Sequence, residues 1–271
     1  MQYIFGIIIF LIGTALGSFI SVIASRYNTG LPFLKGRSVC FSCNTQLSKK
    51  DLIPIFSFLS LGGRCRYCQS KIPAEVFITE ILMGILAFFV ASKAQIFNFQ
   101  FSIFNLTYFF ILLSIFAIIL LISVYDLKHF IIPDSFLISL FVLSFLSIIL
   151  NTSPIIHSFL SGIILATPFL LIFLISKGRW LGFGDVKYIA VLGFFLGFAQ
   201  GLSAVVLAFW IGAAFSLTAL FLKKIVPHIN LPLLKNNLTI KSEIPFGPFL
   251  SLGIVISFCL SLDIFKIHEL F

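Results

Sequence analysis

Long apolar runs recur along the whole 271-residue chain, and they constrain its fold more than any other feature. A helix that crosses a bilayer needs roughly 17–25 mostly apolar residues, which is more than a soluble core requires. The chain is 60% hydrophobic and 10% charged, against roughly 45–50% apolar residues in soluble domains. The sequence therefore predicts an all-α polytopic membrane protein with about eight transmembrane helices, at approximately Tyr3–Ser25, Val76–Ser92, Phe104–Tyr125, Ser135–Leu150, Ile155–Ile175, Val186–Ala199, Leu202–Leu222 and Phe246–Leu262.

The polar and basic residues divide the chain into parts and orient it. Residues 1–25 form the first predicted transmembrane helix, because this run lacks the basic start of a secretory signal and is long for one. Residues 26–75 form a water-exposed loop domain, and residues 76–271 form the rest of the membrane domain. With the N-terminus outside, all basic residues except Lys93 and Lys266 lie on the cytoplasmic side, as the positive-inside rule requires.

The net charge of +9 follows from this orientation. It predicts contact between the cytoplasmic loops and anionic membrane lipids. Nucleic acid is not an expected partner, because the sequence shows no aromatic-basic platform or recognised nucleic-acid-binding motif.

Two acidic residues lie where a lipid-soluble chain should not carry them. Asp126 follows the run that ends at Tyr125, and Asp185 lies in the break Gly182-Phe183-Gly184-Asp185. Carboxylates at membrane depth cost several kcal/mol unless they are paired or face water, so they indicate a functional site. Both acids fall at cytoplasmic helix ends, so the sequence predicts that they meet although 59 positions (185 − 126) separate them.

A close pair of carboxyl groups in an apolar setting can hydrolyse an amide. One proton is shared between the two acids, because like charges at close range disfavour double ionisation. The carboxylate can then take a proton from water while its protonated partner donates to the scissile carbonyl. Gly182 and Gly184 fit this role by permitting unusual backbone angles and close approach of a substrate. A simple helix kink is the alternative interpretation of these glycines.

Four of the five cysteines occur as two Cys-x-x-Cys pairs in the loop, and this spacing is typical of a structural zinc site. Four protein ligands leave no open position on the metal, so the zinc is predicted to shape the loop and not to perform the chemistry. Disulfides are the alternative, which a reducing cytoplasm disfavours. The predicted ligands are Cys40, Cys43, Cys65 and Cys68.

The sequence resembles the bacterial type IV prepilin peptidases, which are intramembrane aspartic proteases of the Gly-x-Gly-Asp type. The resemblance runs nearly the full length of the chain and rests on a series of motifs in a fixed order. These are Gly17-Ser18-Phe19 with Arg26, Arg37-Ser38-x-Cys40-x-x-Cys43, Ile53-Pro54, Gly63-Arg64-Cys65-Arg66-Tyr67-Cys68, Glu80, Asp126-Leu127, Ile132-Pro133-Asp134, Gly182-Phe183-Gly184-Asp185-Val186-Lys187 and Pro245-Phe246-Gly247-Pro248-Phe249.

The resemblance implies an activity and partners. Members cleave the short basic leader from prepilins or pseudopilins at the cytoplasmic face, just after a glycine, and Asp126 and Asp185 match the catalytic acids. Many members then methylate the new N-terminal amine with S-adenosylmethionine. The chain departs from the family pattern in the region linked to methyl transfer, at Ser21, Phe41, Val76 and Phe77.

Three charged residues near these motifs have competing interpretations. Asp134 follows Pro133 at a predicted helix start, where capping is favoured over catalysis. Lys187 could steady an ionised acid or hold a backbone carbonyl, and it could equally anchor the helix in the cytoplasmic headgroups. Glu80 lies within the second run, where Arg26, Arg37 or a substrate amine could pair with it, and a structural ion pair is the favoured interpretation.

Two other classes of protein remain possible from sequence. A proton- or cation-coupled transporter also places carboxylates at broken helices. The sequence shows no convincing internal repeat, however, and both acids lie near the boundary and not at the midplane. A non-enzymatic assembly factor could use the zinc loop to dock its partners. Replacement of either acid distinguishes these classes, since only a protease loses prepilin cleavage while its fold and zinc persist.

Overall fold

The computed structural model describes residues 2–30, 32, 37–96, 102–152, 154–225 and 244–266. Within these ranges the chain is helical, and β structure is limited to two isolated bridges. The elements are α1 (Gln2–Arg26), η1 (Lys49–Leu52), α2 (Phe56–Ser60), α3 (Ala74–Lys93), α4 (Ile103–His129), α5 (Asp134–Leu150), α6 (Ile155–Ser176), α7 (Phe183–Ile225) and α8 (Gly247–Leu260). The predicted all-α membrane fold is confirmed.

Five of these helices are long and apolar enough to cross a membrane, namely α1, α3, α4, α6 and α7, counted over the described residues. The helices α5 and α8 are shorter but equally apolar. Each of the eight predicted spans corresponds to one helix or to one half of α7. The chain is therefore a multi-pass membrane protein.

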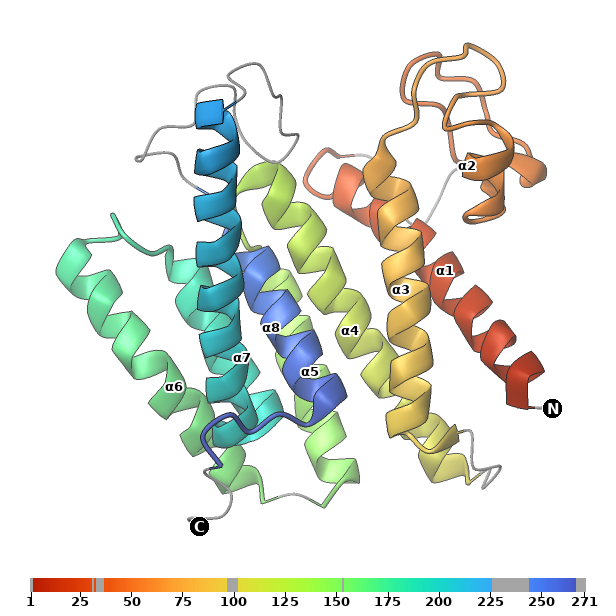
Figure 1. The fold of residues 1–271 in the computed structure, drawn as a ribbon. Coiled ribbons are helices and arrows are strands. Elements are labelled where there is room, and N and C mark those ends of the chain that lie inside the picture. Colours follow the sequence, from red (N-terminus) through yellow and green to blue (C-terminus); the bar gives the residue numbers. More distant parts are fainter. Residues whose placement is uncertain are drawn as a thin grey trace. The chain divides into compact units, whose positions relative to one another are not determined.

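The chain divides into two compact units, Met1–Val124 and Tyr125–Phe271, and α4 begins in the first unit and ends in the second. In the first unit α1 and α3 lie side by side (Figure 1). Their close approach depends on Gly13-x-x-x-Gly17 in α1, because a Cβ atom on Gly17 would lie 2.6 Å from the carbonyl oxygen of Thr79. Such small-residue spacing is typical of tight helix pairs in membranes.

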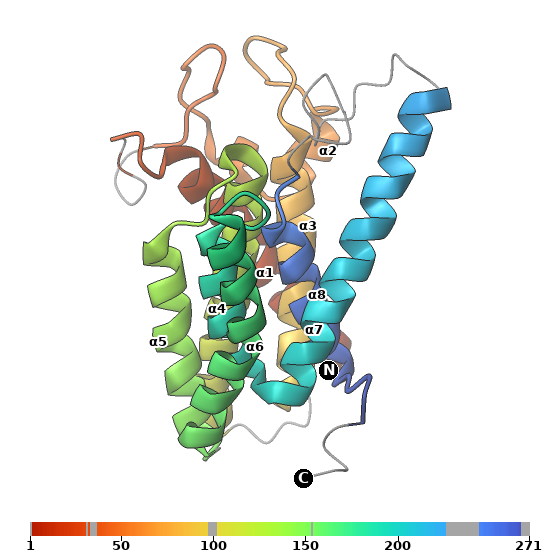
Figure 2. The ribbon, with the colours of Figure 1, turned by 90° about the vertical axis from the view of Figure 1, so that its left-hand side faces the viewer.

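In the second unit α7 packs against α5, α6 and α8. Glycine again permits the close contacts, since a Cβ atom on Gly193 of α7 would lie 2.9 Å from the Cα atom of Gly162 in α6. Gly197 interrupts α7 with a left-handed φ of 76°, and the two halves of the helix point in different directions (Figure 2). The single break at Gly197 replaces the predicted gap between residues 199 and 202, because glycine alone adopts this φ without strain.

Two predicted helix ends are wrong. The helix α4 continues to His129, so Asp126 lies inside its last turn and not after it. The helix α7 begins at Phe183, so Asp185 lies in its first turn and not in the preceding break. A prediction from hydropathy ends each helix at its first charged residue. In the structure the helical backbone hydrogen bonds continue past that residue into the polar boundary.

Candidate functional site

The two acids of interest lie in the second unit, at the end of α4 and the start of α7. Asp126 is buried with an exposed fraction of 4%, and Asp185 is half-buried. The two carboxyl groups lie close enough to interact electrostatically. The structure therefore brings together the pair that the sequence predicted from their unusual placement. One acid is enclosed and the other is accessible, as a site that admits a substrate requires.

The Asp126 carboxylate is held by the first residue of α8. The backbone N–H of Gly247 donates to Asp126 Oδ2 over 3.0 Å. This N–H is one of the donors that a helix N-terminus leaves free, so it suits an anionic partner. A Cβ atom at position 247 would lie 2.6 Å from Asp126 Oδ2, so only glycine allows the carboxylate to approach this closely.

A chain of hydrogen bonds supports this contact from behind. The fully buried Tyr188 lies one turn after Asp185, and its hydroxyl is 2.8 Å from Ser251 Oγ. Ser251 Oγ donates in turn to the carbonyl oxygen of Gly247 over 3.0 Å. The network therefore links the helix of one acid to the glycine that holds the other. Sequence reasoning named Gly247 only as part of a family motif and gave Ser251 and Tyr188 no role, because their contacts are long-range.

The glycines around Asp185 act through close approach and not through unusual backbone angles. Neither Gly182 nor Gly184 has a positive φ, so that part of the prediction is wrong. The Gly182 carbonyl accepts the N–H of Asp185 over 3.2 Å, and a Cβ atom on Gly182 would lie 3.3 Å from Asp185 Oδ2. A Cβ atom on Gly184 would lie 3.3 Å from the Cβ atom of Ile132. Gly182 therefore keeps a side chain away from the second acid, and Gly184 allows α7 to approach Ile132.

Lys187 and Asp134 form an ion pair at this end of the unit. The Lys187 ammonium also lies 5.0 Å from the centre of the Phe183 ring. Lys187 therefore steadies an acid, and that acid is Asp134. Asp134 is not the N-cap, because Pro133 occupies that position, but it is the acidic residue in the first turn of α5, so the predicted complement to the helix dipole is present. A cation from another helix satisfies the carboxylate in place of the backbone.

The four cysteines of the loop come together in the first unit, within two copies of one turn. Cys40 N–H donates to the Thr45 carbonyl and Cys65 N–H to the Ser70 carbonyl, over 3.0 and 2.9 Å. A left-handed residue follows each pair, Asn44 at φ 54° and Gln69 at φ 58°. Repetition of the turn after 25 residues (65 − 40) supplies two pairs of sulfurs with the same local geometry.

The sulfurs fit a tetrahedral metal. Their Sγ atoms all lie within 4.8 Å of one another, and Cys40 and Cys68 are 3.8 Å apart. A tetrahedron with zinc–sulfur bonds of about 2.3 Å has edges of about 3.8 Å. Hydrogen bonds from the backbone of Cys43 and Ser42 lower the pKa of the Cys40 thiol to about 6, which favours the thiolate that a metal binds. All four cysteines are free thiols and not disulfides.

Asp51, which sequence reasoning missed, connects the two cysteine turns. Its side chain is 4% exposed, and it accepts hydrogen bonds from Ser48 Oγ at 2.7 Å and Arg66 Nε at 2.7 Å. The hydroxyl of Tyr67 donates to the same carboxylate over 3.2 Å. The Ser48 hydroxyl, and then the Arg66 guanidinium, hold the pKa of Asp51 at about 2. The capping pattern Ser48-x-x-Asp51 was the available sequence signal.

Glu80 lies in α3, facing the loop domain, and is 5% exposed. The ion pair expected from the sequence is replaced by neutral donors. The backbone N–H of Ile55 donates to Glu80 Oε2 over 2.7 Å, and the Ser18 side chain also donates to the carboxylate. The two arginines bond elsewhere, Arg26 to the Pro32 carbonyl and Arg37 to Gln46.

Two protein-family models match consecutive parts of the chain. Residues 11–94, which include the four cysteines and Glu80, match the Bacterial Peptidase A24 N-terminal domain. Residues 111–217, which include both acids, match the Type IV leader peptidase family.

Several curated proteins are similar over most of the chain. A Vibrio cholerae protein named prepilin leader peptidase/N-methyltransferase is 28% identical over 207 residues, which cover 71% of this chain and 78% of the relative. A Bacillus subtilis protein of the same name is 30% identical over 190 residues, covering 69% and 72%. An Escherichia coli leader peptide-processing enzyme for type 4 prepilin-like proteins is 40% identical over 70 residues, covering 26% and 24%. No solved structure shows significant similarity to the chain.

Proposed function

Because the chain belongs to the type IV leader peptidase family, we propose that it removes the basic leader of type IV prepilins or pseudopilins with Asp126 and Asp185 as the catalytic pair. One observation carries the catalytic assignment. Two carboxyl groups from distant parts of the chain interact in an apolar unit, one enclosed and the other accessible. Placing two carboxyl groups in an apolar unit costs folding free energy, and a catalytic role of the pair explains why the chain carries them.

The proposed reaction is direct hydrolysis by a shared-proton pair. One carboxylate takes a proton from a water molecule as the water oxygen attacks the scissile carbonyl. The protonated partner donates to the carbonyl oxygen. When the tetrahedral species collapses, the acid that took the water proton gives it to the departing amine, and a hydroxyl of the tetrahedral carbon returns its proton to the other carboxylate. The Gly247 N–H keeps the Asp126 oxygen in a fixed orientation throughout. The absence of a side chain at Gly182, beside Asp185 Oδ2, leaves that carboxylate without a Cβ atom 3.3 Å away.

We assign the four-cysteine cluster to a structural zinc ion. Cys40, Cys43, Cys65 and Cys68 would supply all four ligands. A metal so enclosed contributes folding free energy and has no position for a reacting water. We accordingly treat residues 26–75 as a zinc-binding domain and residues 76–271 as the protease domain.

We also propose the orientation of the chain in a bacterial cytoplasmic membrane. With the N-terminus outside, the loop after α1 and the end of α4 fall on the cytoplasmic side, because α3 and α4 cross in opposite directions. The concentration of lysine and arginine in these loops supports this orientation. Anionic lipids are the partners that such basic loops attract. Lys35, Lys235 and Lys241, three of these basic residues, lie outside the described residues.

The relatives' names include a second activity, N-methylation. We propose that this chain also methylates the amine exposed by cleavage, with S-adenosylmethionine as donor. A coupled transporter is disfavoured as the alternative, because family membership indicates prepilin processing and both acids lie at one end of their helices.

The decisive experiment is cleavage of a purified prepilin by the detergent-solubilised enzyme. Asp126→Asn and Asp185→Asn should each lower the cleavage rate by about 10²–10⁴-fold, because each removes a proton-transfer group. Glu75→Gln is the matched control, since Glu75 is an exposed acid in the other unit. Zinc content and thermal unfolding should match wild type in all three variants. Cleavage at the wild-type rate by either aspartate variant would reject the mechanism.

A further inference from the structure

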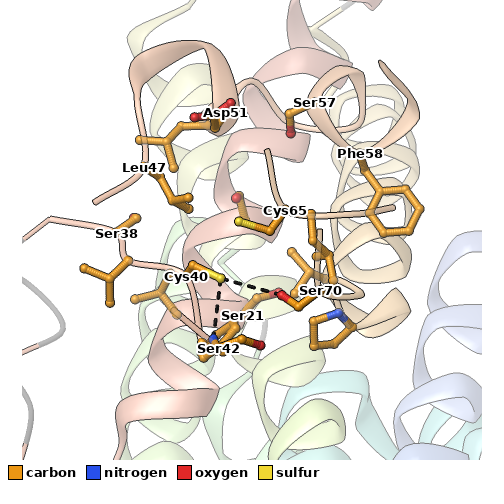
Figure 3. A pocket seen from close by; sticks show the side chains of 18 of the residues that line it. Ser21, Ser38, Cys40, Ser42, Leu47, Asp51, Ser57, Phe58, Cys65 and Ser70 are labelled. Atoms are coloured by element: carbon orange, nitrogen blue, oxygen red, sulfur yellow. Dashed lines mark hydrogen bonds between the residues drawn. The ribbon is translucent and has the colours of Figure 1, made fainter. Parts of the chain in front are cut away.

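The short helix α2 of the cysteine loop has an inner and an outer face. On the inner face, Ser57 and Phe58 line a cavity of about 360 Å³ between the cysteine turns, the end of α1 and the start of α3 (Figure 3). The Phe58 ring also stacks on Phe77 of α3, with ring centres 4.6 Å apart. The inner face of α2 is therefore covered by other parts of the first unit.

The outer face of α2 is exposed within the part of the chain that the structure describes. Ile53, Phe56 and Leu59 recur at a spacing of three residues, so their side chains lie on one side of the segment. They are 48%, 65% and 63% exposed, and none of them lines the cavity. Large apolar side chains that are exposed together indicate a surface that contacts something other than water.

Glu80 fixes the depth of this segment along the membrane helices. It lies six residues after Ala74, the first residue of α3 (80 − 74), which is about 9 Å along the helix axis. Its carboxylate accepts the N–H of Ile55 over 2.7 Å and a hydrogen bond from Ser18, eight residues before the end of α1 (26 − 18). Figure 1 shows α2 at the height of these turns of α1 and α3.

This level corresponds to the boundary between headgroups and acyl chains. Both α1 and α3 are long and apolar enough to cross a membrane. The 20 residues of α3 extend over about 30 Å, which is roughly the thickness of the hydrocarbon core. A point about 9 Å from the start of α3 therefore lies at the depth of roughly 5–10 Å that interfacial helices reach.

The backbone around Ile55 suits a medium with little water, where each polar backbone group needs a partner within the protein. Pro54 has no N–H, the N–H of Ile55 donates to Glu80, and the N–H of Phe56 donates to the Pro54 carbonyl over 2.6 Å. The last bond closes a tight turn in which Ile55 has a φ of 61° and a ψ of −52°, a rare and strained conformation. Such strain persists where surrounding contacts fix it, and here it directly precedes the exposed Phe56.

Basic residues border the apolar face. Lys49 and Lys50 begin η1, which contacts α2, and both lysines are exposed. Arg64 follows α2 and is also exposed. Asp51 is the only acid between residues 26 and 73, and Arg66 already pairs with it. The segment combines an apolar face with a local excess of positive charge, which is the combination that binds anionic membrane surfaces.

We propose that residues 49–60 lie in the membrane interface, with Ile53, Phe56 and Leu59 among the lipid acyl chains and Lys49 and Lys50 at the phosphates of anionic lipids. Lysine side chains can reach from an apolar level to the headgroups. This lipid contact rests on the cytoplasmic orientation given in the proposed function and not on the peptidase reaction. It holds the cysteine turns and the cavity close to the bilayer surface.

Fluorescence quenching of a single tryptophan in the full-length, zinc-loaded enzyme tests this placement. Trp180 and Trp210, the two tryptophans of the chain, are replaced by phenylalanine, and the enzyme is reconstituted into vesicles of phosphatidylcholine and phosphatidylglycerol. In this background the fluorescence of Phe56→Trp should fall roughly twofold with lipids brominated on their acyl chains, because the ring lies among those chains. Iodide in the water should quench it only weakly.

Two further positions serve as references. Leu82→Trp, at an exposed position within the membrane span of α3, should be quenched by brominated lipid. Tyr67→Trp should be quenched by iodide only, because Tyr67 lies beside the ion pair of Asp51 and Arg66. Zinc content and prepilin cleavage, measured on each preparation, identify any variant that has not folded.

The contribution of the lysines is measured in the same Phe56→Trp enzyme. Lys49→Gln together with Lys50→Gln should reduce the quenching by brominated lipid, and so should vesicles of phosphatidylcholine alone. Each basic residue near an anionic surface contributes about fivefold to the binding equilibrium. Unchanged quenching under both conditions would overturn the contact between these lysines and anionic lipid.

Two results would overturn the placement of the apolar face. Quenching of Phe56→Trp by iodide and not by brominated lipid would place this face in water. Protection from both quenchers would show that protein covers it, as contact with residues 125–271 would produce. Loss of prepilin cleavage in wild type would instead refute the proposed function, and it would leave the quenching of Phe56→Trp unchanged.

Discussion

The cysteine loop and the acid pair are organised in opposite ways. In the loop, two copies of one short turn each place two sulfurs, and a single metal would join the copies. At the acid pair, helix ends separated by up to 121 positions (247 − 126) each contribute one group. The loop is thus built from local geometry and a metal, whereas the acid pair depends on the packing of three helices.

This difference determines what each region can tolerate. A structural metal contributes a large part of the folding free energy of a small domain, so the loop should fail as a whole when one ligand is lost. The acid pair is held by helices that glycine contacts already fix in place, such as Gly193 against Gly162. A small change at the acids should therefore alter the chemistry and leave the fold intact.

The largest effect should follow loss of one cysteine. Cys65 is 4% exposed, and Cys65→Ser removes a thiolate from a site with four ligands. Bound zinc should fall from about one per chain to well below half, with a loss of several kcal/mol of the roughly 10–16 kcal/mol that structural zinc supplies. Metal analysis and protease protection of residues 37–73 measure the effect. Cys259→Ser in α8 is the control and should retain full zinc.

The same preparation tests the comparison between the regions. If they are organised separately, prepilin cleavage should fall by a much smaller factor than zinc content. A parallel fall of zinc content and prepilin cleavage would show that the acid pair depends on the loop, so that the two regions are not organised separately.

The second effect should follow Gly247→Ala. The added Cβ atom would lie 2.6 Å from Asp126 Oδ2 and must displace the carboxylate. A misplacement of about 1 Å at a reacting group costs roughly 100-fold in rate. The rest of α8 should be unharmed, because Gly247 is the first residue of that helix.

Gly212→Ala provides the matched control for that variant, since its new Cβ atom meets the Phe249 ring at an ordinary 3.4 Å. Cleavage rate and unfolding temperature are measured for both. A Gly247→Ala enzyme that cleaves at the Gly212→Ala rate would show that the position of Asp126 is not restricted by residue 247.

The contrast also explains what could be predicted from sequence. The cysteine ligands follow from spacing within a few residues, and apolar run length gave the helical membrane fold. The two acids were identified because isolated charges are costly in lipid. Each of these signals is local or compositional, so one sequence was enough to detect it.

The contacts that complete each region could not be found in this way. The partner of Lys187 is 53 positions away (187 − 134), and Tyr188 reaches Ser251 over 63 (251 − 188). Long-range partners depend on how helices pack, which hydropathy does not encode. Glu80 was expected to pair with arginine. In the structure the Ile55 N–H donates to the Glu80 carboxylate instead, because the loop folds back onto α3.

A smaller effect is expected at the support behind Gly247. Tyr188→Phe removes the hydroxyl that contacts Ser251 and leaves the buried ring in place. One hydrogen bond is worth about 1 kcal/mol net, so the cleavage rate should fall about fivefold. Ser251→Ala and the double variant complete a cycle, in which a coupling energy above about 0.5 kcal/mol is expected for contacting residues. If the effects of Tyr188→Phe and Ser251→Ala simply add in the double variant, the two residues belong to separate hydrogen-bond networks.

The smallest effect should come from Asp51 and depends on pH. Its folded pKa of about 2 lies below the ordinary 3.8, so the carboxylate stabilises the loop above pH 4 and loses this contribution as the pH falls toward 2. Asp51→Asn should therefore destabilise the loop at pH 7 by about 1 kcal/mol, and the difference from wild type should shrink below pH 4. Protonation of the cysteines weakens zinc binding in both proteins, so it cancels in this difference. Denaturant unfolding at a series of pH values measures it, and a difference that grows as the pH falls would mean that Asp51 does not join the two cysteine turns as a carboxylate.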